Sequence, residues 1–467
     1  TTATASLRPE RTTDFFFVSL AIGGGLLVAV SPKLGVAAVL AACVGAIMLR
    51  RPSVFVALLI VSVFFGAVKI GGLTMARIVG PIALIVTGAV VLNRRSFGLE
   101  GSSIHRWIGA YGLLAVASIF WSLSAGDTYS LLVSLVLAVT YMLAITTLIQ
   151  TRDDLELAML TFPFAAIGLA VLGMVALSIY KTPIAAEPLI GDRNFFAAFL
   201  VVALPPSFLL LVRARSFWMR AAAVAAIVLI VVAVLGSGSQ GGMLSMLGIG
   251  FAACLIVPRP EVRRRLMPVF VVLLPLALVA ATMILSAGGA ESQGASGAKS
   301  AIKKSSVDRV NLWLGATTAV REHPVTGIGY GSYAPNAAAF MLETEGVDLQ
   351  NYNLPQHPQE AHNSYLEALA ELGPLGLFLF LGMIGSTVFA LSRALRNAHL
   401  NDDRQLAAIS QTLLLSLIGF AIASVFLSVA TNRGWWVLFA LAIVVARIDQ
   451  ASLPAAANGS EPALAKT

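Results

Sequence analysis

Long apolar runs alternate with short polar segments along most of the chain, and this pattern predicts a bundle of membrane helices. A helix needs about 20 predominantly apolar residues to cross the hydrocarbon core of a bilayer. Because several runs are shorter and short pairs could be re-entrant, we expect 12 to 14 spans. The candidate spans are residues 14–30, 34–49, 53–69, 77–92, 107–122, 129–149, 157–180, 195–212, 219–235, 241–257, 267–286, 364–392, 405–428 and 435–447.

The composition agrees with this pattern. Of 467 residues, 58% are hydrophobic and only 12% are charged, and the mean hydropathy is +0.87. So few charged residues cannot cover the surface of a soluble protein, so the predicted class is an all-α polytopic integral membrane protein. The first apolar run leads into the second without a small-residue cleavage site, so we expect no cleavable signal peptide.

Basic residues are distributed unequally between the two sets of short loops. With the N-terminus in the cytoplasm, sixteen arginines fall in the inside loops and only six basic residues in the short outside loops. Cytoplasmic loops carry the excess of Lys and Arg in membrane proteins, so we expect both termini to be cytoplasmic. The six outside residues are Lys33, Lys69, Arg77, Lys181, Arg193 and Arg433.

One long loop, residues 287–363, divides the chain. The topology places this loop outside, between the spans of residues 1–286 and those of residues 364–447. The last segment, 448–467, is expected to be a disordered cytoplasmic tail.

Within the long loop, the pattern predicts an amphipathic helix over residues 307–322. Val307, Val310 and Leu314 recur at helical spacing, which predicts that they form the apolar face. A proline at position 324 ends the helix. The glycines that follow, at positions 327, 329 and 331, do not have the spacing of a nucleotide-binding loop.

Several function classes find no support in the sequence. The net charge of +8 could favour nucleic acid, but the charges lie in short loops between spans, so we expect no nucleic-acid partner. Both cysteines lie inside apolar runs, and no His or carboxylate pair has the spacing of a zinc site, so we expect no metal and no cofactor. The sequence contains no internal repeat of the kind that is typical of transporters.

The sharpest candidate for chemistry is His362. Ser364 and Glu367 form a possible capping box, so a helix would start just after the histidine. The positive end of the helix dipole disfavours protonation, so the imidazole would stay neutral and could act as a general base on a hydroxyl. Glu367 and Glu371 lie one turn apart on the same face and could orient the histidine or an acceptor. A solvated loop histidine and a glutamate that only caps the helix are the alternatives.

Arginines in outer segments are candidates for phosphate binding. Arg193 directly precedes a span, and its guanidinium matches phosphate oxygens bidentately, although pairing with Asp192 or with lipid headgroups is an alternative. Arg309 and Arg321, at the two ends of the predicted loop helix, could provide a second contact, and Arg309 is preferred. Arg433 precedes Trp435-Trp436, which is typical of an interfacial anchor.

At these positions the chain resembles the O-antigen ligase/polymerase superfamily of bacterial envelope glycosyltransferases. Three patterns carry the resemblance: His362-Asn363 followed after nine residues by Gly373-Pro374-Leu375-Gly376, Arg193-Asn194 at the start of a span, and Arg309, Trp313, Pro324 and Gly327-Ile328-Gly329 in the loop.

The resemblance implies a GT-C-like fold in the bacterial inner membrane, with the active site facing outward. It implies metal-independent transfer of a glycan from undecaprenyl diphosphate to an acceptor glycan or lipid A core, with inversion at the anomeric carbon. Arg193 and Arg309 would bind the diphosphate and His362 would be the base. Membrane lipids would surround the protein, and apolar grooves between spans would hold the prenyl chain.

Two positions depart from the pattern. Leu377 stands where ligases often carry Thr or Val, which leaves a polymerase of the same superfamily as the alternative; a transporter of lipid-linked sugars is less favoured. Gln240 stands where many relatives carry an arginine, so an anion contact would depend on its amide. Asp192, Asn194, Asn363, Glu367 and Glu371 remain candidates for positioning the acceptor.

Overall fold

The computed structural model describes residues 52–66, 68–70, 73–94, 97–180, 191–256, 309–345, 347, 358–428 and 432–452. The chain divides into two units, Thr1–Leu58 and Leu59–Thr467. The described residues of the first unit belong to the start of helix α3 (Pro52–Phe64). The candidate site lies in the second unit.

The described part of the second unit is helical, apart from one short antiparallel pair, β1 (Lys69–Ile70) and β2 (Leu73–Thr74). Residues 309–322 form a further helix. The other helices are α4 (Met75–Arg94), α5 (Ile104–Ala117), the 3-10 helix η1 (Ser118–Phe120), α6 (Ala125–Leu148), α7 (Arg152–Tyr180), α9 (Arg193–Arg213), α10 (Phe217–Gly236), α11 (Gln240–Ile256), α15 (Tyr333–Leu342), α16 (Ser364–Leu400), α17 (Arg404–Ala423) and α18 (Arg433–Ala451).

The helices confirm the predicted class, an all-α polytopic membrane protein. In the described part, seven helices are long and apolar enough to cross a membrane, and four more apolar helices are shorter. Each predicted span that falls on described residues overlaps with one of these helices, although the span 53–69 was predicted too long, since α3 ends at Phe64 and Lys69 belongs to β1. The predicted spans 14–30, 34–49 and 267–286 lie outside the described residues, as do residues 287–308 of the long loop and residues 453–467 of the predicted tail. Residues 448–451, which were predicted to belong to the tail, continue α18.

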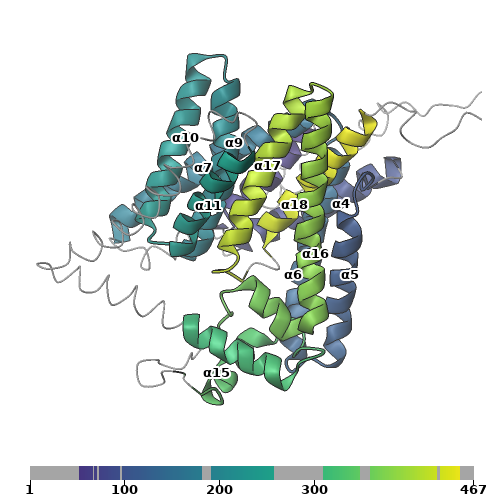
Figure 1. Ribbon diagram of the computed structural model, residues 1–467, viewed down its shortest axis with the longest axis vertical. Coiled ribbons are helices and arrows are strands. Elements are labelled where there is room, and N and C mark those ends of the chain that lie inside the picture. Colours follow the sequence, from purple (N-terminus) through teal and green to yellow (C-terminus); the bar gives the residue numbers. More distant parts are fainter. Residues whose placement is uncertain are drawn as a thin grey trace, which may run out of the picture. The chain divides into compact units, whose positions relative to one another are not determined.

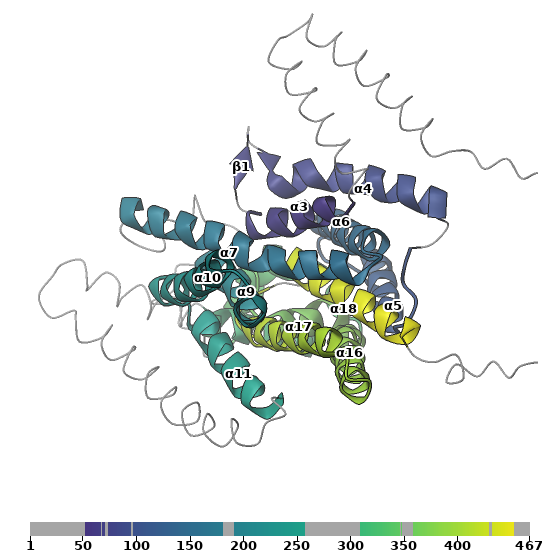
Figure 2. The same cartoon turned by 90° about the horizontal axis from the view of Figure 1, so that it is seen from above.

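Helices α9 and α17 lie side by side in the middle of the bundle (Figure 2). Helix α9 also packs against α7, α10 and α11, whereas α16 packs against α5, α17 and α18. Helices α9, α17 and α18 are buried over most of their length, as expected for helices that are apolar on every side. The first residues of α9, α16 and α18 follow outward-facing segments in the predicted topology, and these helix starts carry the candidate site.

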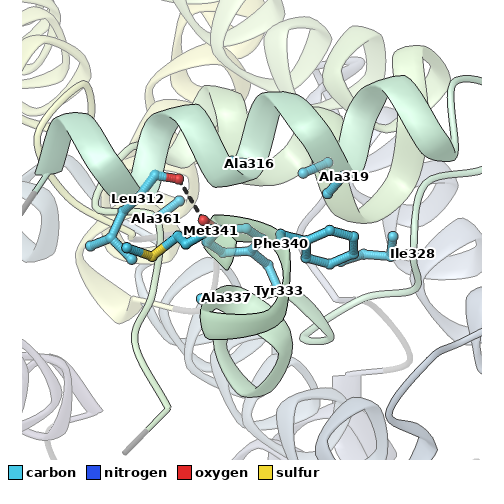
Figure 3. Close-up of a cluster of buried hydrophobic side chains, with 10 residues drawn as sticks. Leu312, Ala316, Ala319, Ile328, Tyr333, Ala337, Phe340, Met341 and Ala361 are labelled. Atoms are coloured by element: carbon cyan, nitrogen blue, oxygen red, sulfur yellow. Dashed lines mark hydrogen bonds between the residues drawn. The ribbon is translucent and has the colours of Figure 1, made fainter. Parts of the chain in front are cut away.

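Two loop helices, 309–322 and α15, lie near the first turns of α16 (Figure 1). Leu312, Ala316 and Ala319 pack against Tyr333, Phe340 and Met341, and the Tyr333 hydroxyl donates a hydrogen bond to the Leu312 carbonyl (Figure 3). This small core holds the helix over residues 309–322, which contains Arg309.

The predicted apolar face of the helix over 309–322 is only partly confirmed, because Leu314 is half-buried and Val307 lies outside the described residues. Val310 is 51% exposed, whereas Leu312, Ala316 and Ala319 are buried. The prediction favoured the largest aliphatic side chains, but the close approach of two short helices favours alanine.

The two tryptophans after Arg433 were also wrongly predicted. Trp435 and Trp436 are fully buried and do not form an interfacial belt. Trp435 packs edge-on against Phe380 and Phe420 in the aromatic core between α16, α17 and α18.

Candidate functional site

The start of α9 holds Arg193 in a buried position. Asp192 caps the helix, since its Oδ1 accepts hydrogen bonds from the backbone amides of Asn194 and Phe195. The Oδ1 atom of Asn194 accepts a hydrogen bond from Ser239. This bond draws the turn before α11 toward the start of α9, and a Cβ added at Gly238 would lie 3.7 Å from Nη1 of Arg193. Arg193 itself is only 9% exposed.

A second arginine reaches the same place from the loop. Arg309 is the first described residue of the helix over 309–322 and is also 9% exposed. Burial lowers the pKa of the Arg309 guanidinium; the positive charge of Arg193 lowers it further, and Asp192 opposes this effect. Two buried like charges with one nearby carboxylate form a site that an anion would stabilise.

His362 is held directly before α16. Asn363 caps this helix by accepting the amides of Tyr365 and Leu366, so the predicted capping box of Ser364 and Glu367 is wrong. The Ser364 amide and hydroxyl donate instead to the carbonyls of Ser424 and Leu427 at the end of α17. Residue 362 adopts φ +50°, an uncommon conformation for a residue with a side chain, and the bonds on its C-terminal side hold it there.

The surroundings of His362 favour its neutral form. Burial lowers the pKa of the imidazole; Asp192 opposes this shift, and the positive charge of Arg309 adds to it. Nδ1 is buried and has no hydrogen-bond partner in the described part of the chain. The sequence argument attributed the neutral form to the helix dipole, whereas in the structure burial is the main cause.

Asp192, Arg193, Arg309 and His362 therefore meet at one place, although they come from three separate segments. Arg321 does not join them. It is exposed at the other end of the 309–322 helix, twelve residues from Arg309 and hence about 18 Å along the axis at 1.5 Å per residue. Gln240, the first residue of α11, is exposed beside the turn that contacts Arg193.

Helix α16 is interrupted at Gly373, and the loop is hydrogen-bonded to the helix backbone at this interruption. Gly373 has non-helical angles, φ +66° and ψ −170°, and Pro374 has no amide hydrogen to donate to the Ala370 carbonyl. The amide of Ile328 donates to that carbonyl instead, at 3.0 Å, and the amide of Gly329 donates to the Glu371 carbonyl at 2.8 Å. A Cβ on Gly373 would lie only 2.2 Å from the Val325 carbonyl oxygen. The loop motif Gly327-Ile328-Gly329 and the motif Gly373–Gly376 therefore meet at one connection between the loop and α16, which we call the joint.

Glu371 belongs to this joint. Its Oε2 accepts the Gly331 amide at 2.8 Å and its Oε1 accepts the Tyr333 amide at 3.1 Å, with the residue 3% exposed. Both oxygens already accept backbone hydrogen bonds. Glu367, one turn earlier, is half-buried.

The structure adds a carboxylate that the sequence argument missed. Glu360, two residues before His362, is exposed to solvent. The surrounding protein, and then the negative charge of Asp192, raise the pKa of Glu360 to about 7. The short distance to His362 along the sequence was the available signal. No group of three or more His, Cys, Asp or Glu side chains in the described ranges could hold a metal ion.

An apolar cavity of about 250 Å³ opens beside this cluster. Asp192 lines the cavity at its polar edge together with Arg433, and the remaining wall includes Leu169, Phe195 and Phe199. The cavity therefore shares Asp192 with the site that contains His362.

Fold and site together define a polytopic helical membrane protein with a buried basic site and a histidine where a polar loop meets the bundle. Residues 225–381 match the family model described as O-Antigen ligase. This match includes Arg309, His362 and the Gly373–Gly376 motif, but not Arg193.

A similar curated protein is "Putative polysaccharide ligase RC0486" of Rickettsia conorii, which is 24% identical over 209 residues. The alignment covers 44% of this chain and 47% of that protein, so the chain matches about half the length of its relative. Together the two matches confirm the predicted resemblance to the O-antigen ligase/polymerase superfamily.

Proposed function

We propose that the protein transfers a glycan from an undecaprenyl-diphosphate donor to a sugar hydroxyl of an acceptor, on the outer face of the bacterial inner membrane. The observation that carries this proposal is the convergence of Arg193, Arg309 and His362 from three separate segments. Their residue types fit the three needs of the reaction, which are a bound diphosphate, a stabilised leaving group and a proton acceptor.

The two arginines bind the donor diphosphate. The diphosphate leaves with the electron pair of the bond between its oxygen and the anomeric carbon, so negative charge develops on its oxygens. Buried guanidinium groups stabilise that charge more strongly than water-exposed ones. The repulsion between Arg193 and Arg309, expressed in the lowered pKa of Arg309, is relieved when the anion binds.

His362 accepts the proton of the attacking hydroxyl. The new bond joins that oxygen to the anomeric carbon on the face opposite the leaving diphosphate, so the configuration inverts. A base must be unprotonated to act, and burial of His362 lowers its pKa and favours the neutral imidazole. The acceptor is a sugar of lipid A core or of another glycan, and Glu367 and Glu360 are the carboxylates placed to bind its hydroxyls.

The test is reconstitution of purified protein with a lipid-linked glycan and an acceptor. His362→Ala and Arg193→Ala are expected to abolish transfer while the unfolding temperature stays unchanged. Arg321→Ala, which removes an exposed arginine of the same loop, is the matched control and should retain activity. Normal transfer by purified His362→Ala would exclude the mechanism.

A polymerase is the second candidate, because Leu377 departs from the ligase pattern. The same reconstitution separates the two, since a ladder of product lengths from a lipid-linked repeat unit indicates a polymerase and a single product a ligase.

A further inference from the structure

Arg433 is a half-buried arginine at the start of α18 that the proposed reaction does not use. It is the first residue of α18, and Asn432 caps that helix. Its guanidinium lies over the Tyr141 ring, 5.7 Å from the centroid. Nε is buried and has no hydrogen-bond partner among the described residues. Burying an unsatisfied donor of a charged group is costly, so the arginine needs a further reason to be there.

Three other arginines of the described part have acceptors within the protein. Arg152 pairs with Asp403, and Arg213 pairs with Glu156. Arg447 donates to the backbone carbonyls of Gly98, Thr146 and Ile149. The different environment of Arg433 indicates that its acceptor is supplied from outside the chain.

The space in front of Arg433 is the apolar cavity of about 250 Å³. Besides Arg433 and Asp192, its wall includes Val63, Phe64, Leu169, Phe195, Phe196 and Phe199. One cation at the edge of such an apolar wall matches a molecule with an anionic head and a hydrocarbon chain. Pockets that enclose a drug-sized ligand have volumes of about 300–1,000 Å³. This cavity is smaller, so it holds only the start of a chain.

Asp192 connects this cavity with the site at His362. It lines the cavity, and its charge acts on both Arg309 and His362. A diphosphate that reaches past Asp192 would have its sugar end near His362 and its lipid end near Arg433.

We infer that Arg433 binds the lipid-side phosphate of a prenyl diphosphate and that the cavity holds the first isoprene units of its chain. This inference rests on the proposed function, because it assigns the orientation of the same donor. Arg193 and Arg309 bind the sugar-side phosphate, so the three arginines determine which end of the diphosphate faces His362.

Binding of glycan-free lipids to the purified full-length protein in nanodiscs tests the inference. The probes are undecaprenyl diphosphate, undecaprenyl monophosphate and inorganic diphosphate. Arg433→Gln should weaken binding of both lipids about 10- to 100-fold, the range of a lost hydrogen bond to a charged group. Arg433→Lys keeps a point charge without the planar fork and should recover part of the affinity. Arg321→Gln is the matched control and should bind like the wild type.

The affinities of the variants for the three probes distinguish the role of Arg433 from that of Arg193. Arg193→Gln should weaken the diphosphate lipid far more than the monophosphate, whereas Arg433→Gln should weaken both. In transfer assays, Arg433→Gln should raise the KM for the donor with little change in kcat. Inorganic diphosphate should bind much more weakly than the lipid, because it cannot fill the cavity.

If Arg433→Gln binds both lipids with wild-type affinity while Arg193→Gln loses affinity for the diphosphate lipid, the inference is overturned. The proposed function would still stand. Inorganic diphosphate binding as tightly as the lipid overturns the role of the cavity. Wild-type transfer by Arg193→Gln and His362→Ala overturns the proposed function itself. If Arg433→Gln lowers the unfolding temperature, Arg433→Lys decides the question, since wild-type affinity in a folded lysine variant excludes a bidentate phosphate contact.

Discussion

The two ends of the helix bundle use arginine in different ways. The three ion pairs that join described residues all lie at the end where α9 finishes and α17 begins. At the opposite end, where α9, α16 and α18 begin, burial and the nearby charge of Arg193 lower the pKa of Arg309, and Arg433 lines an apolar cavity. The first arrangement joins helices, whereas the second gathers cationic groups at the candidate site.

Glu156 shows how the first end works. It accepts hydrogen bonds from Arg213 of α9 and from Gln405 of α17, so one carboxylate connects three helices. Arg152 of α7 reaches both Asp403 and Ser452. These contacts are partly exposed, and exposed ion pairs contribute little individually, so their value lies in fixing helix ends.

The largest expected difference comes from Arg309→Gln compared with Arg213→Gln. Loss of a buried cation at the leaving group should reduce transfer about 10²- to 10³-fold, in line with removal of one stabilising donor from an active site. Arg213→Gln removes an arginine of the other end and should leave transfer within about twofold. Turnover of lipid-linked glycan measures both, and equal losses would contradict the division between the ends.

The joint at Gly373 should be the next most sensitive position. Gly373→Ala introduces a Cβ 2.2 Å from the Val325 carbonyl oxygen at a positive φ, so the loop should detach from α16. We expect a destabilisation of about 1–3 kcal/mol and at least a tenfold loss of transfer. Limited proteolysis of the outer loop reports the detachment.

Gly385→Ala is the control for this prediction, because a Cβ on Gly385 of the same helix meets nothing within 4 Å. It should leave both proteolysis and transfer unchanged. If the outer loop of Gly373→Ala stays resistant to proteolysis, the joint does not hold Arg309 in place.

A smaller effect is expected for Asp192→Asn, which should change the pH dependence of glycan transfer. Asp192 raises the pKa of His362 against the effect of burial, and asparagine can cap α9 equally well. Removing the negative charge should lower the pKa further, so the neutral base persists to lower pH. The acidic limb of the kcat/KM profile should therefore move to lower pH, whereas Asp127→Asn, at an exposed position of α6, should not move it. A shift to higher pH would argue against His362 as the base.

The smallest effect is expected for Arg152→Gln. The pair with Asp403 is part-exposed, so its loss should cost about 0.2–1 kcal/mol of the free energy of unfolding and leave transfer unchanged. Thermal unfolding in detergent measures the first and the reconstituted assay the second. A large loss of transfer would show that this end also contributes to the reaction.

Much of the fold could be predicted because apolar runs of membrane-spanning length have few alternatives. A membrane core leaves no partner for free backbone groups, so a run such as 195–212 must become a helix, and α9 is that helix. The inward face of the 309–322 helix was not predictable in the same way, since outside the membrane the neighbouring chain decides which residues are buried. Trp435 and Trp436 were misplaced for the same reason, because their burial depends on α16 and α17.

The candidate site shows a similar division. His362, Arg193 and Arg309 were found from residue type and motif spacing. Asn194 and Glu371 were expected to orient an acceptor, but Asn194 accepts a hydrogen bond from Ser239 and Glu371 accepts two loop amides. Spacing along the chain indicates which residues are unusual but not which partners they meet.

The sequence by itself determined the class of protein, the helices of the bundle and the residue types that could bind a diphosphate and remove a proton. These properties depend on local hydropathy and side-chain chemistry, which act within a few residues. Only the tertiary structure decided that Arg193, Arg309 and His362 share one site, that Glu371 and Gly373 join the loop to the bundle, and that Arg433 lines an apolar cavity. Each of these depends on contacts between segments that are far apart in the chain, and the local pattern of residues does not specify such contacts.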